Sequence, residues 1–167
     1  MTDSQIVVWY TMVVTKATIK SAIYKLFYNT IVDNYGNPHT TRFLVYHSFP
    51  LDKLTDRAAY PLIVVNGPYF SDDVEFTFRE TTYDCELTVM IYHTSKKDLC
   101  TMVEGIVNLI ENRTKSVFEA NGVEFLKITS DGSEPFDHGS QSGNNAVLGH
   151  VETITFEMKV YLNRINT

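Results

Sequence analysis

Positive charge is scarce in this chain and is nowhere concentrated. Its 167 residues include 14 Lys and Arg against 20 Asp and Glu, which gives a formal net charge of −6 at pH 7. The longest basic cluster is the pair Lys96-Lys97. Surfaces that coat nucleic acid are usually basic, because they neutralise phosphates. The composition therefore argues against a nucleic-acid-coating protein, although folding can still gather a local basic patch.

Long hydrophobic runs are also missing. The longest, "IVVWYTMVV" at residues 6–14, is well short of the roughly twenty residues that span a membrane, and no basic stretch precedes it. We therefore expect no transmembrane helix, no signal peptide and no membrane partner. The expected location is a cytosol, or an assembly that is built there.

Cysteine is limited to Cys85 and Cys100, too few for a disulfide framework. Both lie in apolar patterns, which predicts two buried, reduced thiols. The neighbours of Cys100, Leu99 and Met102, favour a structural thiol over a reactive one.

Recognisable catalytic and cofactor-binding motifs are absent from the sequence. It has no GxSxG, GxGxxG or GxxxxGK[ST] stretch, and its five histidines have neither zinc-protease spacing nor a neighbouring CxxC. Two metal-site alternatives stay open, Asp137-His138 with His150 and the acidic group Asp72-Asp73 with Glu75. Solvated polar residues are the simpler interpretation of both. We therefore expect no enzyme activity, no cofactor and no bound metal.

Helical periodicity is present in two places. From about Thr11 to Asp33, apolar side chains recur every three or four residues, and Gly36 and Pro38 end the pattern. A second helix is predicted to begin after Ser95, which has capping-box spacing to Asp98, and to end between Asn112 and Lys115. The predicted buried positions are Ile19, Ile23, Leu26, Phe27, Thr30 and Ile31 in the first helix and Leu99, Met102, Val103, Ile106 and Ile110 in the second.

Strands are predicted in runs on both sides of the second helix. Pro61 is expected at the start or edge of its strand, because it has no N–H to donate. The alternation from Tyr83 to Ile91 predicts a half-buried antiparallel strand. The pattern predicts an α+β fold with a single domain over residues 1–167, in which a mostly antiparallel sheet packs against an N-terminal helix and a central helix. The predicted strand segments are Arg42–Phe49, Ala59–Pro68, Val74–Thr94 (two strands or one bent strand), Val123–Ser130 and Val151–Asn163.

A long polar segment, "SDGSEPFDHGSQSGNNAVLGH" at Ser130–His150, separates the last two predicted strands. Loops beyond roughly 12–15 residues are uncommon unless they are functional or disordered. Tyrosine is also frequent, with ten copies, and is favoured at protein interfaces. The predicted partner-interface residues are Asp131, Glu134, Phe136, Asp137, His138, Gln141, Asn144 and Asn145 of the loop, with Tyr24 and Tyr28 of the first helix.

Three features of the chain resemble the tail terminator, or tail-completion, proteins of tailed bacteriophages. The first is an early strand with an internal proline, "YPLIVV". The second is "YDCELTVMIYHT" leading into the helix "LCTMVEGIVNLI". The third is a polar loop and a long final strand, "GHVETITFEMKVYL". The resemblance covers roughly residues 11 to 163.

The resemblance implies a structural virion protein at the head-proximal end of the tail, assembled in the host cytoplasm. Its partners would be other copies in a ring, expected to be a hexamer, together with the tail tube protein and a head–tail connector or neck protein. DNA would pass through the lumen without specific binding, since an acidic wall repels phosphates. The alternatives are another neck or minor tail protein, a sheath terminator, or a small ligand- or metal-binding domain.

Overall fold

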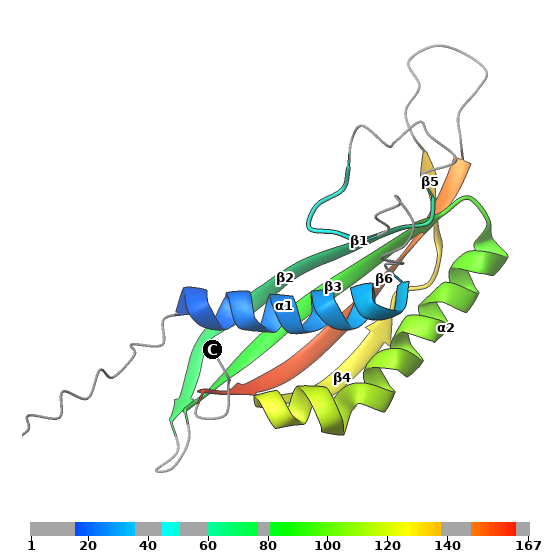
Figure 1. Ribbon diagram of the computed structural model, residues 1–167. Helices are drawn as coiled ribbons and strands as arrows, with labels where there is room; N and C mark the ends of the chain where they lie inside the picture. The colour runs from blue at the N-terminus through cyan, green and yellow to red at the C-terminus, as the bar shows by residue number, and fades with distance from the viewer. Residues whose placement is uncertain (1–15, 36–44, 51–59, 77–80, 138–147, 163–167) are drawn as a thin grey trace, which may run out of the picture.

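The computed structural model describes residues 16–35, 45–50, 60–76, 81–137 and 148–162, which form two long helices and one open sheet (Figure 1). The strand order is β1-β2-β3-β6-β4, with β5 following β4 along the same edge of β6. Every pairing is antiparallel except β1 with β2. The elements are α1 Lys16–Tyr35, β1 Val45–Tyr46, β2 Leu62–Phe76, β3 Thr81–His93, α2 Lys96–Arg113, the short helices η3 Thr114–Phe118 and η4 Glu119–Asn121, β4 Val123–Ser130, β5 Glu134–Asp137 and β6 Leu148–Tyr161.

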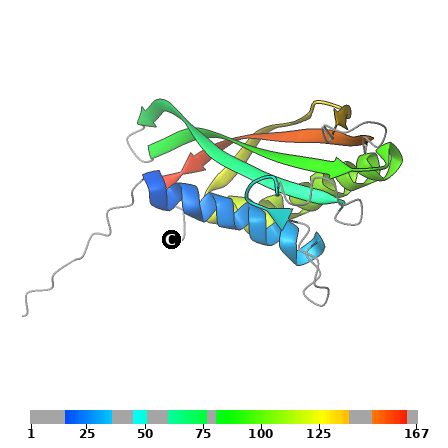
Figure 2. The ribbon, with the colours of Figure 1, turned by 90° about the horizontal axis from the view of Figure 1, so that it is seen from above.

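The two long helices lie on the same face of the sheet (Figure 2). No described helix covers the opposite face, which we call the open face. This arrangement confirms the predicted α+β fold with a mostly antiparallel sheet. None of the described helices is long and apolar enough to cross a membrane.

The core lies between the sheet and the helices. Phe27 of α1 meets Phe118 of η3 and Phe156 of β6 at ring-centroid distances of 4.8 and 5.2 Å. All three side chains are fully buried, and each such burial stabilises the fold by about 1.5–3 kcal/mol. The predicted helix faces are confirmed: every predicted position is buried or, for Leu26 and Met102, partly buried against the core.

The second predicted helix agrees with α2, and two short helical turns follow it. Its start is confirmed, since the Ser95 hydroxyl caps α2 by accepting a hydrogen bond from the Asp98 N–H at 3.4 Å. Its end is confirmed as well, because α2 ends at Arg113, within the predicted range of Asn112 to Lys115. The chain then continues to Asn121 through the short helices η3 and η4, which were not predicted. Burial of Phe118 holds this extra segment on the core, and Gly122, with φ 74°, ends it in the left-handed conformation that glycine tolerates.

The early strands also differ from expectation. Only Val45–Tyr46 of the predicted Arg42–Phe49 strand is a described strand, and residues 42–44 lie outside the described part of the chain. The predicted Ala59–Pro68 strand instead runs on to Phe76, and Pro61 comes just before it, as expected. Pro68 is tolerated inside β2 because residues 67 and 68 lie opposite Leu87 alone, a bulge that frees them from the ladder.

The prediction of one continuous loop from Ser130 to His150 was wrong. Glu134–Asp137 forms β5 and pairs with the first residues of β6, which begins at Leu148. Between β4 and β5, residues 131–133 lie opposite only 152 and 153, so the edge strand bulges there. Gly132 has φ 79°, which accommodates this bulge. β5 forms because it pairs with the first residues of β6. The polar composition of the segment does not indicate a strand.

The two cysteines have different environments. Cys85 is buried in the core of β3, as predicted. Cys100 is exposed, so the prediction of a buried thiol there was wrong. The reason is its position on α2: Leu99 and Val103 face the sheet, and Cys100 lies outside that stripe.

Candidate functional site

The described residues contain no group of three or more His, Cys, Asp and Glu side chains that could hold a metal ion. His150 is half-buried at the start of β6, whereas His138 lies outside the described residues. The side chains of Asp72, Asp73 and Glu75 are likewise not described. Among the residues that the structure describes, neither of these two alternative metal sites is therefore assembled.

The predicted interface residues of the loop have different surroundings. Asp131 is exposed in the bulge, where its N–H donates to the Thr153 carbonyl at 3.1 Å. Glu134 is exposed on β5 opposite Val151, and Asp137 ends the strand. His138, Gln141, Asn144 and Asn145 lie outside the described residues.

Phe136 packs within its own chain. Its ring lies 5.0 Å from that of Tyr92 on β3 and 5.7 Å from that of Phe49, while Phe49 and Tyr92 are 4.7 Å apart. Phe136 is half-buried as a result. This aromatic cluster therefore gives Phe136 a role in the packing of this end of the molecule, which sequence reasoning did not foresee.

A hollow of about 420 Å³ lies further along the sheet, between β2 and β4. We call it the sheet groove, and its opposite sides carry Tyr69, which is 53% exposed, and Leu126, which is 56% exposed. These are the exposed large hydrophobic side chains among the described residues. The groove is lined by Tyr69, Phe70, Ser71, Asp84, Cys85, Glu86, Leu126, Glu157 and Met158.

Two strand irregularities create the sides of the sheet groove. Tyr69 follows directly on the bulge at residues 67 and 68 of β2. Leu126 is the extra residue of a second bulge in β4, because Phe125 pairs with Met158 and Lys127 with Glu157. Bulges redirect side chains and are frequent beside functional sites.

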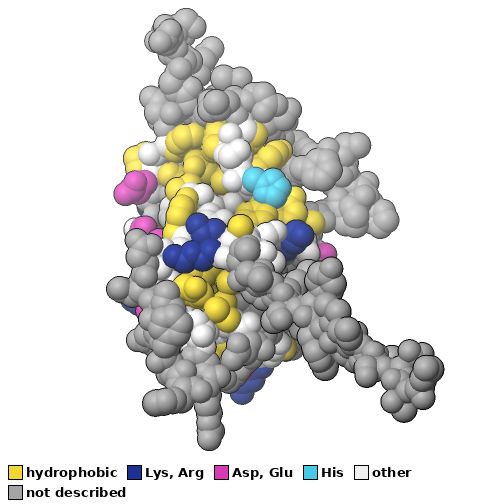
Figure 3. Space-filling model, turned by 90° about the vertical axis from the view of Figure 1, so that its left-hand side faces the viewer, with side chains coloured by type: hydrophobic (Ala, Val, Ile, Leu, Met, Phe, Trp, Pro, Cys, Tyr) yellow, Lys and Arg dark blue, Asp and Glu magenta, His cyan; other side chains and the backbone are white. Residues whose placement is uncertain are grey.

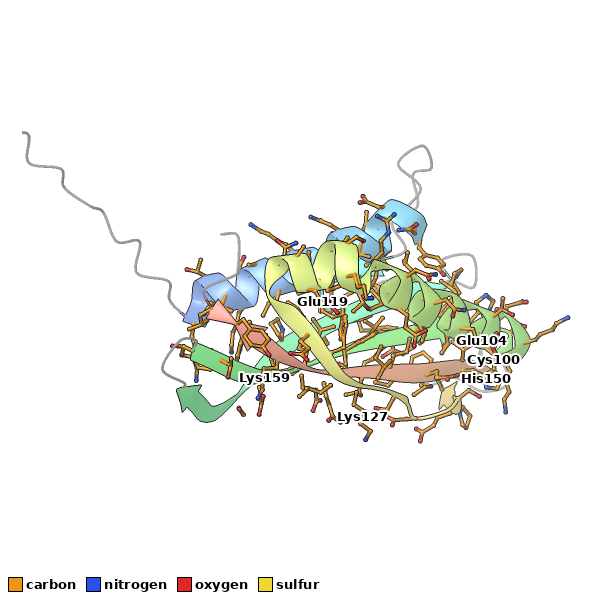
Figure 4. All side chains as sticks on the ribbon, turned by 90° about the horizontal axis from the view of Figure 1, so that it is seen from below. Cys100, Glu104, Glu119, Lys127, His150 and Lys159 are labelled. Atoms are coloured by element: carbon orange, nitrogen blue, oxygen red, sulfur yellow. The ribbon has the colours of Figure 1, made fainter. Side chains whose placement is uncertain are left out.

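The floor of the sheet groove is acidic. Glu86 of β3 and Glu157 of β6 lie directly opposite each other, a like-charge pair that destabilises a sheet. Lys127 lies 3.7 Å from Glu157, in an ion pair whose partners are both largely exposed, and points away from the helices (Figure 4). Such exposed pairs contribute little to stability. Glu86 has no ion-pair partner in the described part of the chain.

A second surface lies along α1. It consists of Lys16, Lys20, Tyr24 and Tyr28, which recur every four residues and so line one side of the helix, together with His47. We call it the lysine–tyrosine surface. The rings of Tyr24 and Tyr28 stack at 5.7 Å, and His47 stacks on them at 4.8 and 5.0 Å. Burial, with Tyr28 as a smaller cause, raises the pKa of Tyr24, whose hydroxyl has no hydrogen-bond partner among the described residues. The predicted pair Tyr24 and Tyr28 is thus brought together.

The lysines of this surface lie among hydrophobic side chains. Figure 3 views the molecule from the side on which α1 begins, and Lys or Arg side chains are surrounded there by hydrophobic ones. Lys16 lies 5.6 Å from the ring of Tyr83, and Lys20 lies 5.8 Å from the ring of Phe70. Both lysines remain exposed. Folding has therefore produced a local cationic patch in an acidic chain.

Sequence reasoning missed Tyr69, Glu86, Leu126 and His47. Pro68 inside an otherwise good strand signals a bulge, and that signal points to Tyr69. The register that sets Glu86 against Glu157, and the packing that brings His47 to α1, have no local sequence signal.

Comparison with known proteins identifies no family for the chain. It matches no protein-family model, and no curated protein matches it.

Proposed function

We propose that the chain is a structural virion protein, a tail terminator of a tailed bacteriophage. In this role several copies, expected to be six, form a ring on the end of the completed tail tube. The ring stops tube elongation and offers the surface that joins the tail to the connector or neck protein of the head.

The observation that carries the proposal is the open face with its sheet groove. An uncovered sheet face that carries exposed Tyr69 and Leu126 beside a hollow of about 420 Å³ suits a protein–protein contact. The sequence resemblance supplies the kind of assembly. An assembly protein needs such surfaces and does not need a catalytic group.

Net charge supports the same role. The formal charge of −6 suits a ring through which DNA moves without adhering, because like charges repel. A structure of the ring with a basic lumen would contradict this part of the proposal.

Electron microscopy of labelled particles tests the proposal. Antibodies against the purified chain are applied to intact phage particles that encode it, with particles of an unrelated phage as the control. Label at the head–tail junction, with a ring of this chain above the tube, is the expected result. Label elsewhere, or none on any particle, would contradict it, and a ring at another level of the neck would indicate a connector or sheath terminator.

A further inference from the structure

The lysine–tyrosine surface and the sheet groove carry opposite charges. The groove lining contains three carboxylates, Asp84, Glu86 and Glu157, and no Lys or Arg. In contrast, residues 16–32 of α1 include Lys16, Lys20 and Lys25 and no Asp or Glu. The charge separation is therefore much larger than the composition of the whole chain suggests.

The acidic floor favours a cation from outside. Glu86 and Glu157 repel each other across two neighbouring strands, and this repulsion costs folding free energy. Lys127 lies 3.7 Å from Glu157 and offsets the charge of that residue alone. The next lysine of β6, Lys159, is the register partner of Asp84 and not of Glu86. A lysine of another molecule beside Glu86 would therefore relieve a repulsion that the fold leaves in place.

The apolar parts of the two surfaces also match in kind. Tyr69 and Leu126 stand exposed beside the groove, and the ring stack of Tyr24, Tyr28 and His47 lies beside the lysines. Aromatic side chains are enriched at protein interfaces, and on both surfaces they lie beside charged groups. Complementary charge also fixes the register of the partners and excludes wrong ones.

We propose that the lysine–tyrosine surface of one copy docks into the sheet groove of a second copy. The inference rests on the proposed function, since it names the contact that would build the ring. Because the two surfaces are different patches of one chain, the contact is heterologous. Such contacts form a closed ring when the rotation between copies closes and a filament when it does not.

Charge reversal tests this contact. Glu86→Lys and the double variant Lys16→Glu with Lys20→Glu are each expected to weaken self-association at least about tenfold, since each places like charges in contact. Combining all three substitutions is expected to restore association. Sedimentation velocity over a range of concentrations measures the effect at low salt.

One further readout separates docking from folding. Glu86→Lys replaces the like-charge pair with an opposite-charge pair facing Glu157, so its thermal midpoint should stay equal or rise while association falls. Matched reversals on exposed positions away from both surfaces, Glu104→Lys on α2 and Lys115→Glu on η3, should leave association unchanged.

Three results would overturn the inference. They are a wild-type chain that stays monomeric up to its solubility limit, charge reversals without effect, and a combined variant that does not recover. The last result would show that the lysines and Glu86 do not contact each other between copies. The proposed function fails separately: a chain that associates through these surfaces but is absent from particles contradicts only the tail-terminator role. A chain found at the head–tail junction whose association ignores the reversals contradicts only this contact.

Discussion

At the scale of single residues, the two thiols differ in access to solvent. Cys100 is exposed on α2, whereas Cys85 is buried and burial raises its pKa to about 12. Only a thiolate reacts readily, so a thiol-specific reagent should modify one cysteine per native chain quickly and the second only after denaturation. Cys100→Ser should abolish the fast reaction and Cys85→Ala should leave it intact. Two fast equivalents in the native protein would contradict the burial of Cys85.

Two buried groups, the thiol of Cys85 and the hydroxyl of Tyr60, predict the response of stability to alkaline pH. Burial is the main cause that raises the pKa of Cys85 from 9.0 to about 12 and that of Tyr60 from 10.0 to about 12. The folded chain therefore keeps protons that the unfolded chain releases. The free energy of unfolding should be intact below pH 9 and should fall as the pH rises towards 12.

Urea unfolding at a series of pH values on both sides of pH 9 measures this dependence. Cys85→Ala should make the decline shallower, because it removes one of the shifted groups, and Cys100→Ala should not. A free energy that stays constant through this pH range would show that these groups are solvated in the folded chain.

At the scale of elements, the start of α2 depends on one side chain. Ser95→Ala removes the hydroxyl that accepts from the Asp98 N–H, and it should lower the free energy of unfolding by about 1 kcal/mol. Ser116→Ala, on the exposed side of η3, is the matched control and should change it much less. Equal effects of the two substitutions in denaturant titrations would contradict the capping role.

At the scale of the whole molecule, we expect the β5–β6 connection to contribute to assembly and little to folding stability. Deleting residues 139–145 leaves His138, Ala146 and Val147 to join two strands that already pair from Asp137 to Leu148. Three residues suffice for a hairpin, so thermal stability should change little. Self-association or tail joining should decrease, as expected for a partner-binding segment. A large loss of stability in the monomer would instead show that the segment packs into the core.

Local sequence chemistry determined the helices, the strand faces and the cap. Apolar side chains at helical spacing have to face the core, which is why Ile19, Ile23 and Phe27 are buried as predicted. Ser95 and Asp98 act within one turn, so the sequence contains all that the cap requires. Alternation along β3 fixes its two faces in the same way.

Tertiary structure decided what depends on register and on distant partners. β5 exists because residues of β6 pair with it, and a polar composition gives no sign of that pairing. Glu86 opposes Glu157, and His47 joins Tyr24 and Tyr28, only after strands and helix are in place. The sequence by itself therefore determined the two long helices, the faces of the long strands and the acidic balance, because these follow from local side-chain properties. Only the folded chain determined the sheet groove and the place of His47 beside the tyrosines of α1, because these arrangements join segments far apart in the sequence.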